Sequence, residues 1–134
     1  MRYLAIDYGS RRIGLAICDA EETIASPLTI LKGAKGVLPL IARIIETEDV
    51  GGIVMGLPLN MDGTEGPQAK LVRTFAKGLE AYVELPIHFQ DERLSSFAAE
   101  EKLNVADFTR GKMRERLDAV AAAEILQAFL ERTK

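Results

Sequence analysis

The sequence has little cysteine and little histidine, and these shortages disfavour several kinds of chemistry. Cys18 is the only cysteine among 134 residues, so no disulfide can form within the chain and a reducing compartment is expected. His88 is the only histidine, and its place in an alternating stretch is typical of a structural or surface residue. Catalysis by a serine–histidine or cysteine–histidine pair is therefore disfavoured.

Long apolar runs and a positive net charge are also missing. No apolar run approaches the ~20 residues of a membrane span, and Asp7 interrupts the amino-terminal apolar run, which is not typical of a signal peptide. We therefore expect a soluble, cytoplasmic protein without a membrane partner. A formal net charge of −3 and a pI near 5.3 argue against nucleic-acid binding through bulk charge. Such binding would need local basic patches.

The apolar periodicity predicts one α/β domain over residues 1–134. Five segments have the composition of β-strands: 2–8, 12–19, 26–31, 51–57 and 83–90. Four segments have helical spacing or a helix cap: 37–48, 67–79, 95–103 and 114–132. Pro86 indicates that the last strand is an edge strand or contains a bulge, and 105–113 is expected to be a polar loop. Three successive strands followed by strand–helix alternation predict a mixed five-stranded sheet, its first three strands an antiparallel meander, flanked by helices.

Two aspartates occupy positions where an apolar residue is expected. Asp7 ends an apolar strand, where it is either a functional carboxylate or a residue that caps the turn before Gly9. Asp118 lies on the face of the last helix that also carries Ile125 and Phe129. A carboxylate there must be paired, protonated or bound to a metal, and an arginine such as Arg114 is the alternative partner.

A further pair of acids, Asp91 and Glu92, directly follows the predicted fifth strand. Ligands gather at strand ends in open α/β sheets, although an Asp-Glu-Arg sequence alone is more typical of a solvated turn. Together with Asp7 and Asp118, these acids predict a site of oxygen ligands at one end of the sheet. Such ligands suit Mg²⁺ or Mn²⁺ better than Zn²⁺.

Four stretches in order, AIDYGSRRIGLAI, GLPLNMDGTEGP, DERLSS and LDAVAAAEILQAFL, resemble the YqgF/RuvX family over nearly the whole chain. Members of that family are named as pre-16S rRNA nucleases or Holliday junction resolvases. The resemblance implies an RNase H-like fold, with Asp7, Glu92 and Asp118 as the catalytic and metal-binding acids. Two features depart from wider relatives: the fourth strand ends in GLPLN without an acid, and Asp118 has only Glu115 nearby on its helix.

The expected activity is metal-dependent hydrolysis of a phosphodiester bond in structured RNA or branched DNA, with water attacking phosphorus. RNA is favoured, as processing of the 5′ end of pre-16S rRNA; Holliday junction resolution is the alternative, and the protein is a monomer or a homodimer. The expected substrate-binding residues are polar or basic: Arg11, Arg12, Asn60, Thr64, Lys70, Arg73, Arg93, Lys112 and Arg114. Lys70, Arg73 and Lys77 share one helix face, which could also be a plain solvated surface.

Two other interpretations of the sequence differ in kind. The DYGSRRIG segment resembles the first phosphate motif of actin-like ATPases and sugar kinases, but those enzymes need two such lobes and 134 residues supply one. A non-catalytic adaptor that binds nucleic acid and retains the fold is the remaining alternative.

Overall fold

The computed structural model describes residues 1–9, 11–33, 35–93 and 110–133, with the side chains of the last helix described from residue 119 onward. Its sheet has the strand order β3-β2-β1-β4-β5. The strands are β1 (Tyr3–Tyr8), β2 (Arg12–Cys18), β3 (Ala25–Lys32), β4 (Gly52–Leu57) and β5 (Ile87–Asp91). Strands β1, β2 and β3 pair antiparallel, whereas β4 pairs parallel with β1 and with β5. The predicted mixed sheet with an antiparallel meander is confirmed.

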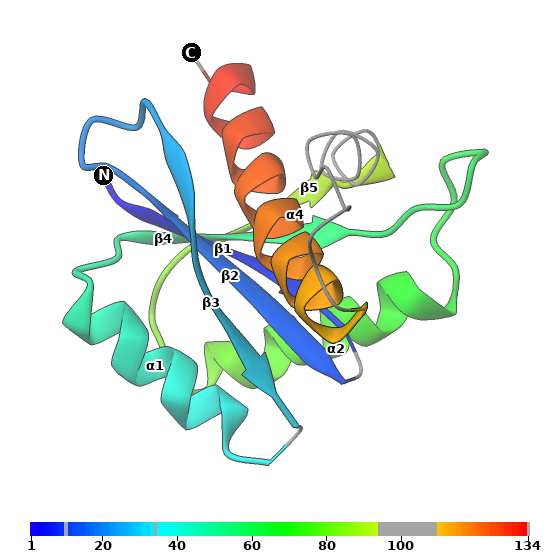
Figure 1. Ribbon diagram of the computed structural model, residues 1–134, viewed down its shortest axis with the longest axis horizontal. Helices are drawn as coiled ribbons and strands as arrows, with labels where there is room; N and C mark the ends of the chain where they lie inside the picture. The colour runs from blue at the N-terminus through cyan, green and yellow to red at the C-terminus, as the bar shows by residue number, and fades with distance from the viewer. Residues whose placement is uncertain (10, 34, 94–109, 134) are drawn as a thin grey trace.

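Helices cover both faces of this sheet (Figure 1). Helices α1 (Val37–Thr47) and α2 (Pro67–Glu80) pack on the face that carries Ile6 and Met55. Helix α4 (Arg110–Arg132) packs on the opposite face, over Ala5 and Val54. Side chains alternate between the two faces of a strand, so consecutive residues of β1 and β4 contribute to two separate cores.

Two predicted boundaries are wrong, and each has a physical reason. The fifth strand begins at Ile87 rather than at 83, because Pro86 has no N–H to donate to a strand ladder. The carbonyl of Pro86 still accepts a hydrogen bond from Ile53 N–H at 2.9 Å. Helix α4 begins at Arg110, so residues 110–113 belong to the helix and not to the predicted polar loop. The helix predicted over 95–103 lies outside the described residues.

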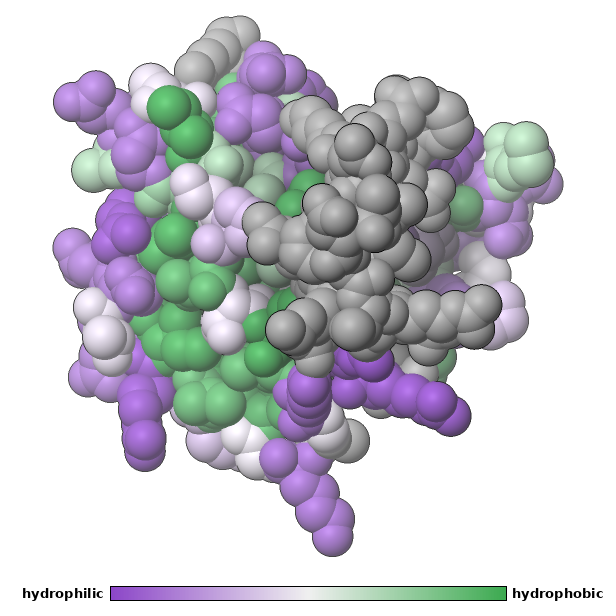
Figure 2. All heavy atoms as spheres, viewed as in Figure 1, coloured by the Kyte–Doolittle hydropathy of each residue, from purple (hydrophilic) through white to green (hydrophobic). Residues whose placement is uncertain are grey.

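The visible face of the molecule carries apolar surface beside helix α4. Figure 2 shows apolar residues gathered to the left of the grey segment, with hydrophilic residues around their margin. Strand β3 is an edge strand on this part of the sheet and is only partly buried.

In the described part of the chain, no helix has the length and apolar character needed to cross a membrane.

Candidate active site

Three residues align across the carboxyl ends of the parallel strands. Asp7 follows Ile6, whose partner in β4 is Met55. The next residue of β4, Gly56, has Gln90 of β5 as its partner. We refer to Asp7, Gly56 and Gln90 as the sheet-end row.

The sheet-end row faces helix α4. Ala5 and Val54 precede Asp7 and Gly56 by two residues, and both pack in the core beneath α4. His88 precedes Gln90 by two residues, and its ring lies 5.1 Å from that of Phe129 in α4. Because alternate residues of a strand share a face, all three members of the row face this helix. Two strands far apart in sequence therefore bring polar side chains under one helix.

Glu92 lies beside Asp7 at this end of the sheet. Its N–H donates to the carbonyl of Leu57 at 3.3 Å, which continues the β4–β5 pairing by one residue. Burial raises the pKa of the Glu92 carboxyl above its ordinary value, a hydrogen bond with the Asp7 side chain lowers the pKa, and the charge of Asp91 raises it. Two carboxyl groups in hydrogen-bond contact hold a proton between them or repel each other, and a divalent cation would relieve that repulsion.

Gly56 makes room for this pair, a role that the sequence does not reveal. A Cβ atom at Gly56 would lie 2.6 Å from Oε2 of Glu92 and 2.6 Å from Cδ1 of Ile125 in α4. The absence of a side chain therefore lets a carboxylate and the helix approach the same point of β4. A glycine within an apolar strand signals close approach of some other group, but the sequence does not say which group.

The structure shows that Asp118 belongs to helix α4 but does not describe its side chain. It lies seven residues before Ile125 in this helix. Where side chains are described, no group of three acidic, histidine or cysteine residues gathers as a metal centre would require. The three-acid site therefore stays a prediction, of which the structure brings together Asp7 and Glu92.

Asp91, predicted to follow the fifth strand, is instead its last residue and pairs with Leu57. Its carboxylate accepts hydrogen bonds from the side chain of Arg93, with Nη2 to Oδ2 at 2.6 Å. These bonds hold the pKa of Asp91 below its ordinary value. The guanidinium also donates to the carbonyls of Asn60 and Met61, at 3.4 and 3.3 Å. Arg93 therefore anchors the loop after β4 to the tip of β5.

Within the loop after β4, the polar groups that are predicted to bind phosphate form hydrogen bonds with one another. Asn60 Nδ2 donates to Thr64 Oγ1 at 3.0 Å, and Asn60 N–H donates to the Thr64 carbonyl at 2.8 Å. Thr64 in turn donates to Asp62, which lowers the pKa of that carboxyl. Beside this loop lies a hollow of about 460 Å³, lined by Leu59, Met61, Asp91 and Arg93. It is a concave surface at the same end of the sheet as Asp7.

The predicted basic stripe on α2 contains one residue that is already paired. Arg73 makes a two-pronged ion pair with Glu65, at 2.6 and 2.7 Å, and its guanidinium carbon lies 4.7 Å from the centre of the Phe89 ring. Lys70 and Lys77 are exposed. The excess positive charge of this helix face therefore comes from the two lysines.

The remaining predicted substrate-binding residues lie at the β1–β2 turn and on α4. Arg11 lies in this turn and is exposed, and Arg12, the first residue of β2, is half-buried. A Cβ at Gly9 would lie 2.7 Å from the carbonyl oxygen of Arg12, so the turn needs glycine there. Lys112 and Arg114 belong to α4, with side chains outside the described residues.

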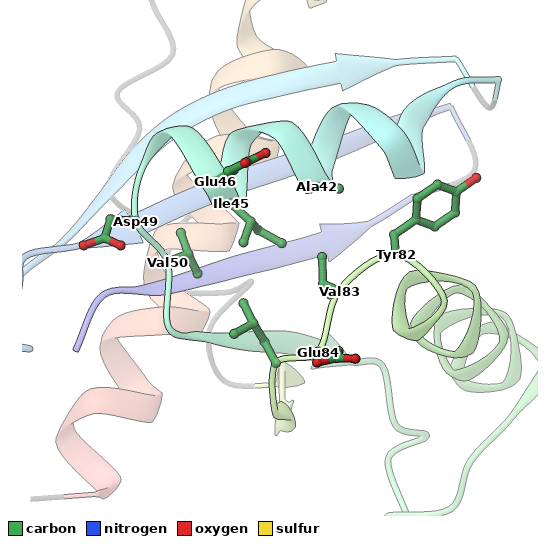
Figure 3. A pocket seen from close by; sticks show the side chains of 9 residues that line it. Ala42, Ile45, Glu46, Asp49, Val50, Tyr82, Val83 and Glu84 are labelled. Carbon is green, nitrogen blue, oxygen red and sulfur yellow. The ribbon is translucent and has the colours of Figure 1, made fainter.

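A second hollow lies at the opposite end of the sheet and is chemically unlike the first. It has a volume of about 390 Å³, and residues of α1 and of the segment before β5 line it (Figure 3). Glu46, Asp49 and Glu84 are its charged lining residues, and no basic residue contributes among those that the structure describes. A lining whose charged residues are all acidic repels phosphate, so this hollow is not suited to a nucleic-acid backbone.

Comparison with known proteins places the chain in a family. The sequence model described as "RuvX: Holliday junction resolvase" matches residues 1–132. The chain belongs to the RuvX family. A Maridesulfovibrio salexigens relative is 43% identical over 134 residues, which cover 98% of this chain and 99% of that protein. A Paracoccus denitrificans relative is 44% identical over 131 residues, which cover 96% of this chain and 83% of that protein. Both are named "Putative pre-16S rRNA nuclease".

Solved structures support the same fold at lower sequence identity. T. thermophilus RuvC in complex with a Holliday junction substrate matches with a TM-score of 0.61 and 14% identity, covering 99% of this chain and 96% of that chain. The fowlpox virus Holliday junction resolvase matches with a TM-score of 0.60 and 14% identity, covering all of both chains. The RuvX-family chain therefore has the RNase H-like fold of these resolvases, as its sequence motifs predict.

Proposed function

We propose that this chain is a metal-dependent endonuclease that hydrolyses phosphodiester bonds of structured RNA in the cytoplasm, and that it processes the 5′ end of pre-16S rRNA. The hydrogen-bonded pair of Asp7 and Glu92 at the carboxyl end of the sheet carries this proposal. Membership of the RuvX family and the names of its 43–44% identical relatives support the reaction class and the RNA substrate.

The side chains at this point suit a hard divalent cation. Asp7 and Glu92 offer oxygen atoms, and the absence of a side chain at Gly56 lets the Glu92 carboxylate lie against β4. The described residues around the pair contribute no thiolate, and the ring of His88 contacts those of Phe129 and Tyr3 farther along the sheet. Oxygen ligands without sulfur or imidazole favour Mg²⁺ or Mn²⁺.

In such a reaction, some side chains of this protein would hold the cation and others would position the substrate. Asp7 and Glu92 would hold the cation, and Asp118 on α4 would be the third acidic ligand. The bound cation would polarise the scissile phosphate and lower the pKa of the attacking water. Lys70, Lys77 and Arg11 would contact phosphates on either side of the cut. Arg93 would keep the loop after β4 in place beside the cleaved strand, because it already bridges Asp91 and that loop.

Cleavage assays test this proposal directly. Purified protein with Mg²⁺ is expected to cut an RNA that carries the 5′ end of pre-16S rRNA, and to cut a four-way DNA junction more slowly. Asp7→Asn removes charge but little volume, so the variant should fold and lose activity by about 100-fold or more, since several kcal/mol of transition-state stabilisation depend on the cation. Full activity of a folded Asp7→Asn protein would contradict the site. No cleavage of either substrate by the wild type would favour a non-catalytic adaptor.

Thermal melting tests the third acid separately. If Asp118 is a ligand, Asp118→Asn should keep or raise the melting temperature in chelator, because mutual repulsion among the acids falls. Added Mg²⁺ should stabilise the wild type by mass action and the variant much less. A lower melting temperature of the variant in chelator would instead mean that Asp118 pairs with a basic residue, and would remove it from the site.

Holliday junction resolution is the second candidate, favoured by the description of the family and by the fold shared with RuvC. Cutting a junction on both sides is natural for a dimer with twofold symmetry. Faster cleavage of four-way junctions than of RNA, together with a dimer in sedimentation, would establish this alternative. A monomer that cuts RNA faster would exclude it.

A further inference from the structure

Gln90 is a buried polar residue whose oxygen atom has no partner where the structure describes the chain. The residue is 9% exposed, and Oε1 lacks a hydrogen-bond donor among the described residues. Leaving a carbonyl oxygen buried and unsatisfied costs free energy comparable to that of a lost hydrogen bond, so each such atom needs an explanation. An apolar residue of the same size would avoid that cost.

The position of Gln90 supplies the explanation. It belongs to the sheet-end row, with Gly56 as its strand partner and Asp7 one strand farther along. Glu92 follows two residues later, and strand alternation directs both side chains to the face of α4. Phe89, between His88 and Gln90, lies on the other face, beneath the guanidinium of Arg73. The unsatisfied oxygen therefore lies on the same face and at the same end of the sheet as the two carboxyls.

We infer that Gln90 is part of the cation site, and that its Oε1 supplies a neutral oxygen donor to the divalent cation held by Asp7 and Glu92. This inference rests on the proposed function, because it assumes that a cation binds there. Amide oxygens are suitable ligands for hard cations and accept hydrogen bonds from water around them. A neutral donor adds an oxygen without adding further negative charge to carboxylates that already repel one another.

Gln127, whose side-chain oxygen and nitrogen both have hydrogen-bond partners, provides a matched control. Gln127 of α4 is half-buried, its Oε1 accepts a hydrogen bond from Ala25 N–H at 3.0 Å, and its Nε2 donates to the Thr23 carbonyl at 3.2 Å. Methionine has nearly the shape of glutamine without its polar atoms. The substitutions Gln90→Met and Gln127→Met therefore remove the same groups from a site with an unsatisfied oxygen and from a site with a satisfied one.

The experiment compares melting temperatures of the full chain in chelator and across a series of Mg²⁺ and Mn²⁺ concentrations, with Mn²⁺ binding also followed by electron paramagnetic resonance. Gln90→Met should hold or raise the melting temperature in chelator, because it removes an unsatisfied oxygen. Its affinity for Mn²⁺ should fall about 10-fold or more, the usual loss when a supporting group of a metal site is removed. Gln127→Met should melt at a lower temperature in chelator and keep the wild-type affinity for Mn²⁺.

Each contrary result has a distinct meaning. A lower melting temperature of Gln90→Met in chelator would show that Oε1 has a partner in the folded chain and would overturn the inference. Unchanged Mn²⁺ affinity in Gln90→Met, beside a wild type that binds Mn²⁺, would overturn it as well and leave the proposed function standing. A wild type that binds neither cation would overturn the metal-dependent function itself.

Discussion

At the scale of single residues, Asp91 and Glu92 are neighbours with opposite environments. Asp91 is paired with Arg93, while Glu92 is half-buried beside Asp7. We therefore expect Glu92→Gln to lower cleavage by about 100-fold or more, as loss of a cation ligand should. Asp91→Asn should lower it by less than about 10-fold, through a looser loop after β4. Single-turnover rates at saturating Mg²⁺ measure both, and a larger loss in Asp91→Asn would transfer the ligand role to that residue.

The environments of Asp91 and Glu92 also predict that pH changes their contributions to folding stability in opposite directions when a chelator removes divalent cations. Burial raises the pKa of Glu92 in the folded protein. Its ionisation therefore destabilises the fold as pH rises from the pKa of about 4.3 in the unfolded chain through the pKa in the folded protein. The hydrogen bond from Arg93 lowers the pKa of Asp91, so its stabilisation is present above about pH 4 and is lost as pH falls. At about pH 7, Glu92→Gln should raise the melting temperature and Asp91→Asn should lower it. Both differences should shrink towards about pH 3, and shifts of the same sign at neutral pH would contradict these environments.

Some residue roles can be predicted from the sequence and others cannot. Asp7 is recognisable as a candidate because a carboxylate at the end of an apolar strand conflicts with its surroundings, although the same position also suits an aspartate that caps a turn. The pairing of Arg73 with Glu65, and of Arg93 with Asp91, depends on side-chain geometry that composition does not contain. Gln90 carries no signal in the sequence, because a single polar residue near a strand end is ordinary until its burial is known.

At the scale of elements, the contact between β4 and α4 depends on Gly56. In Gly56→Ala, the new methyl group would displace Glu92 or push α4 outward through Ile125. We expect a decrease of about 1–3 kcal/mol in the free energy of unfolding from overpacking, and a decrease of about 100-fold in cleavage from misplacement of Glu92. Chemical denaturation and cleavage rates measure the two effects.

Gly78→Ala is the matched control for that variant. Its Cβ would meet only the flexible end of Leu38, at 3.1 Å, and the substitution improves helix propensity in α2 by about 1 kcal/mol. Activity should stay within about twofold of the wild type, because no residue of the site is disturbed. Wild-type activity in Gly56→Ala would mean that Glu92 does not need its present position.

The helices and strands can be predicted from local sequence patterns, except near their ends. Strands β1, β2 and β4 are close to their predicted bounds because continuous apolar runs leave little choice of register. The start of β5 depends on Pro86, whose missing N–H outweighs the apolar residues before it. Residues 110–113 have the polar composition of a loop, yet they form the first turn of α4, since lysine and arginine are good helix formers.

At the scale of the whole molecule, a net charge of −3 makes the local placement of lysines decisive for nucleic-acid binding. Lys70→Glu combined with Lys77→Glu should weaken RNA binding and reduce the slope of log K against log salt by about 2, because each lysine would neutralise one phosphate. Arg43→Glu, an exposed charge reversal on α1, is the control and should leave the slope unchanged. Equal slopes for wild type and double variant would mark the lysines as a solvated surface.

The position of α4 in the chain sets the order in which the proposed site would assemble during synthesis. All five strands precede this helix in the sequence, and they leave the ribosome first. Until the helix emerges and docks, Ala5 and Val54 lack the α4 residues that pack against them, and under the proposed function Asp118 would not yet join Asp7 and Glu92. A nascent chain that lacks α4 would therefore hold the proposed cation site without its third acid. Under the proposed function, cleavage would begin only after α4 has docked on the sheet.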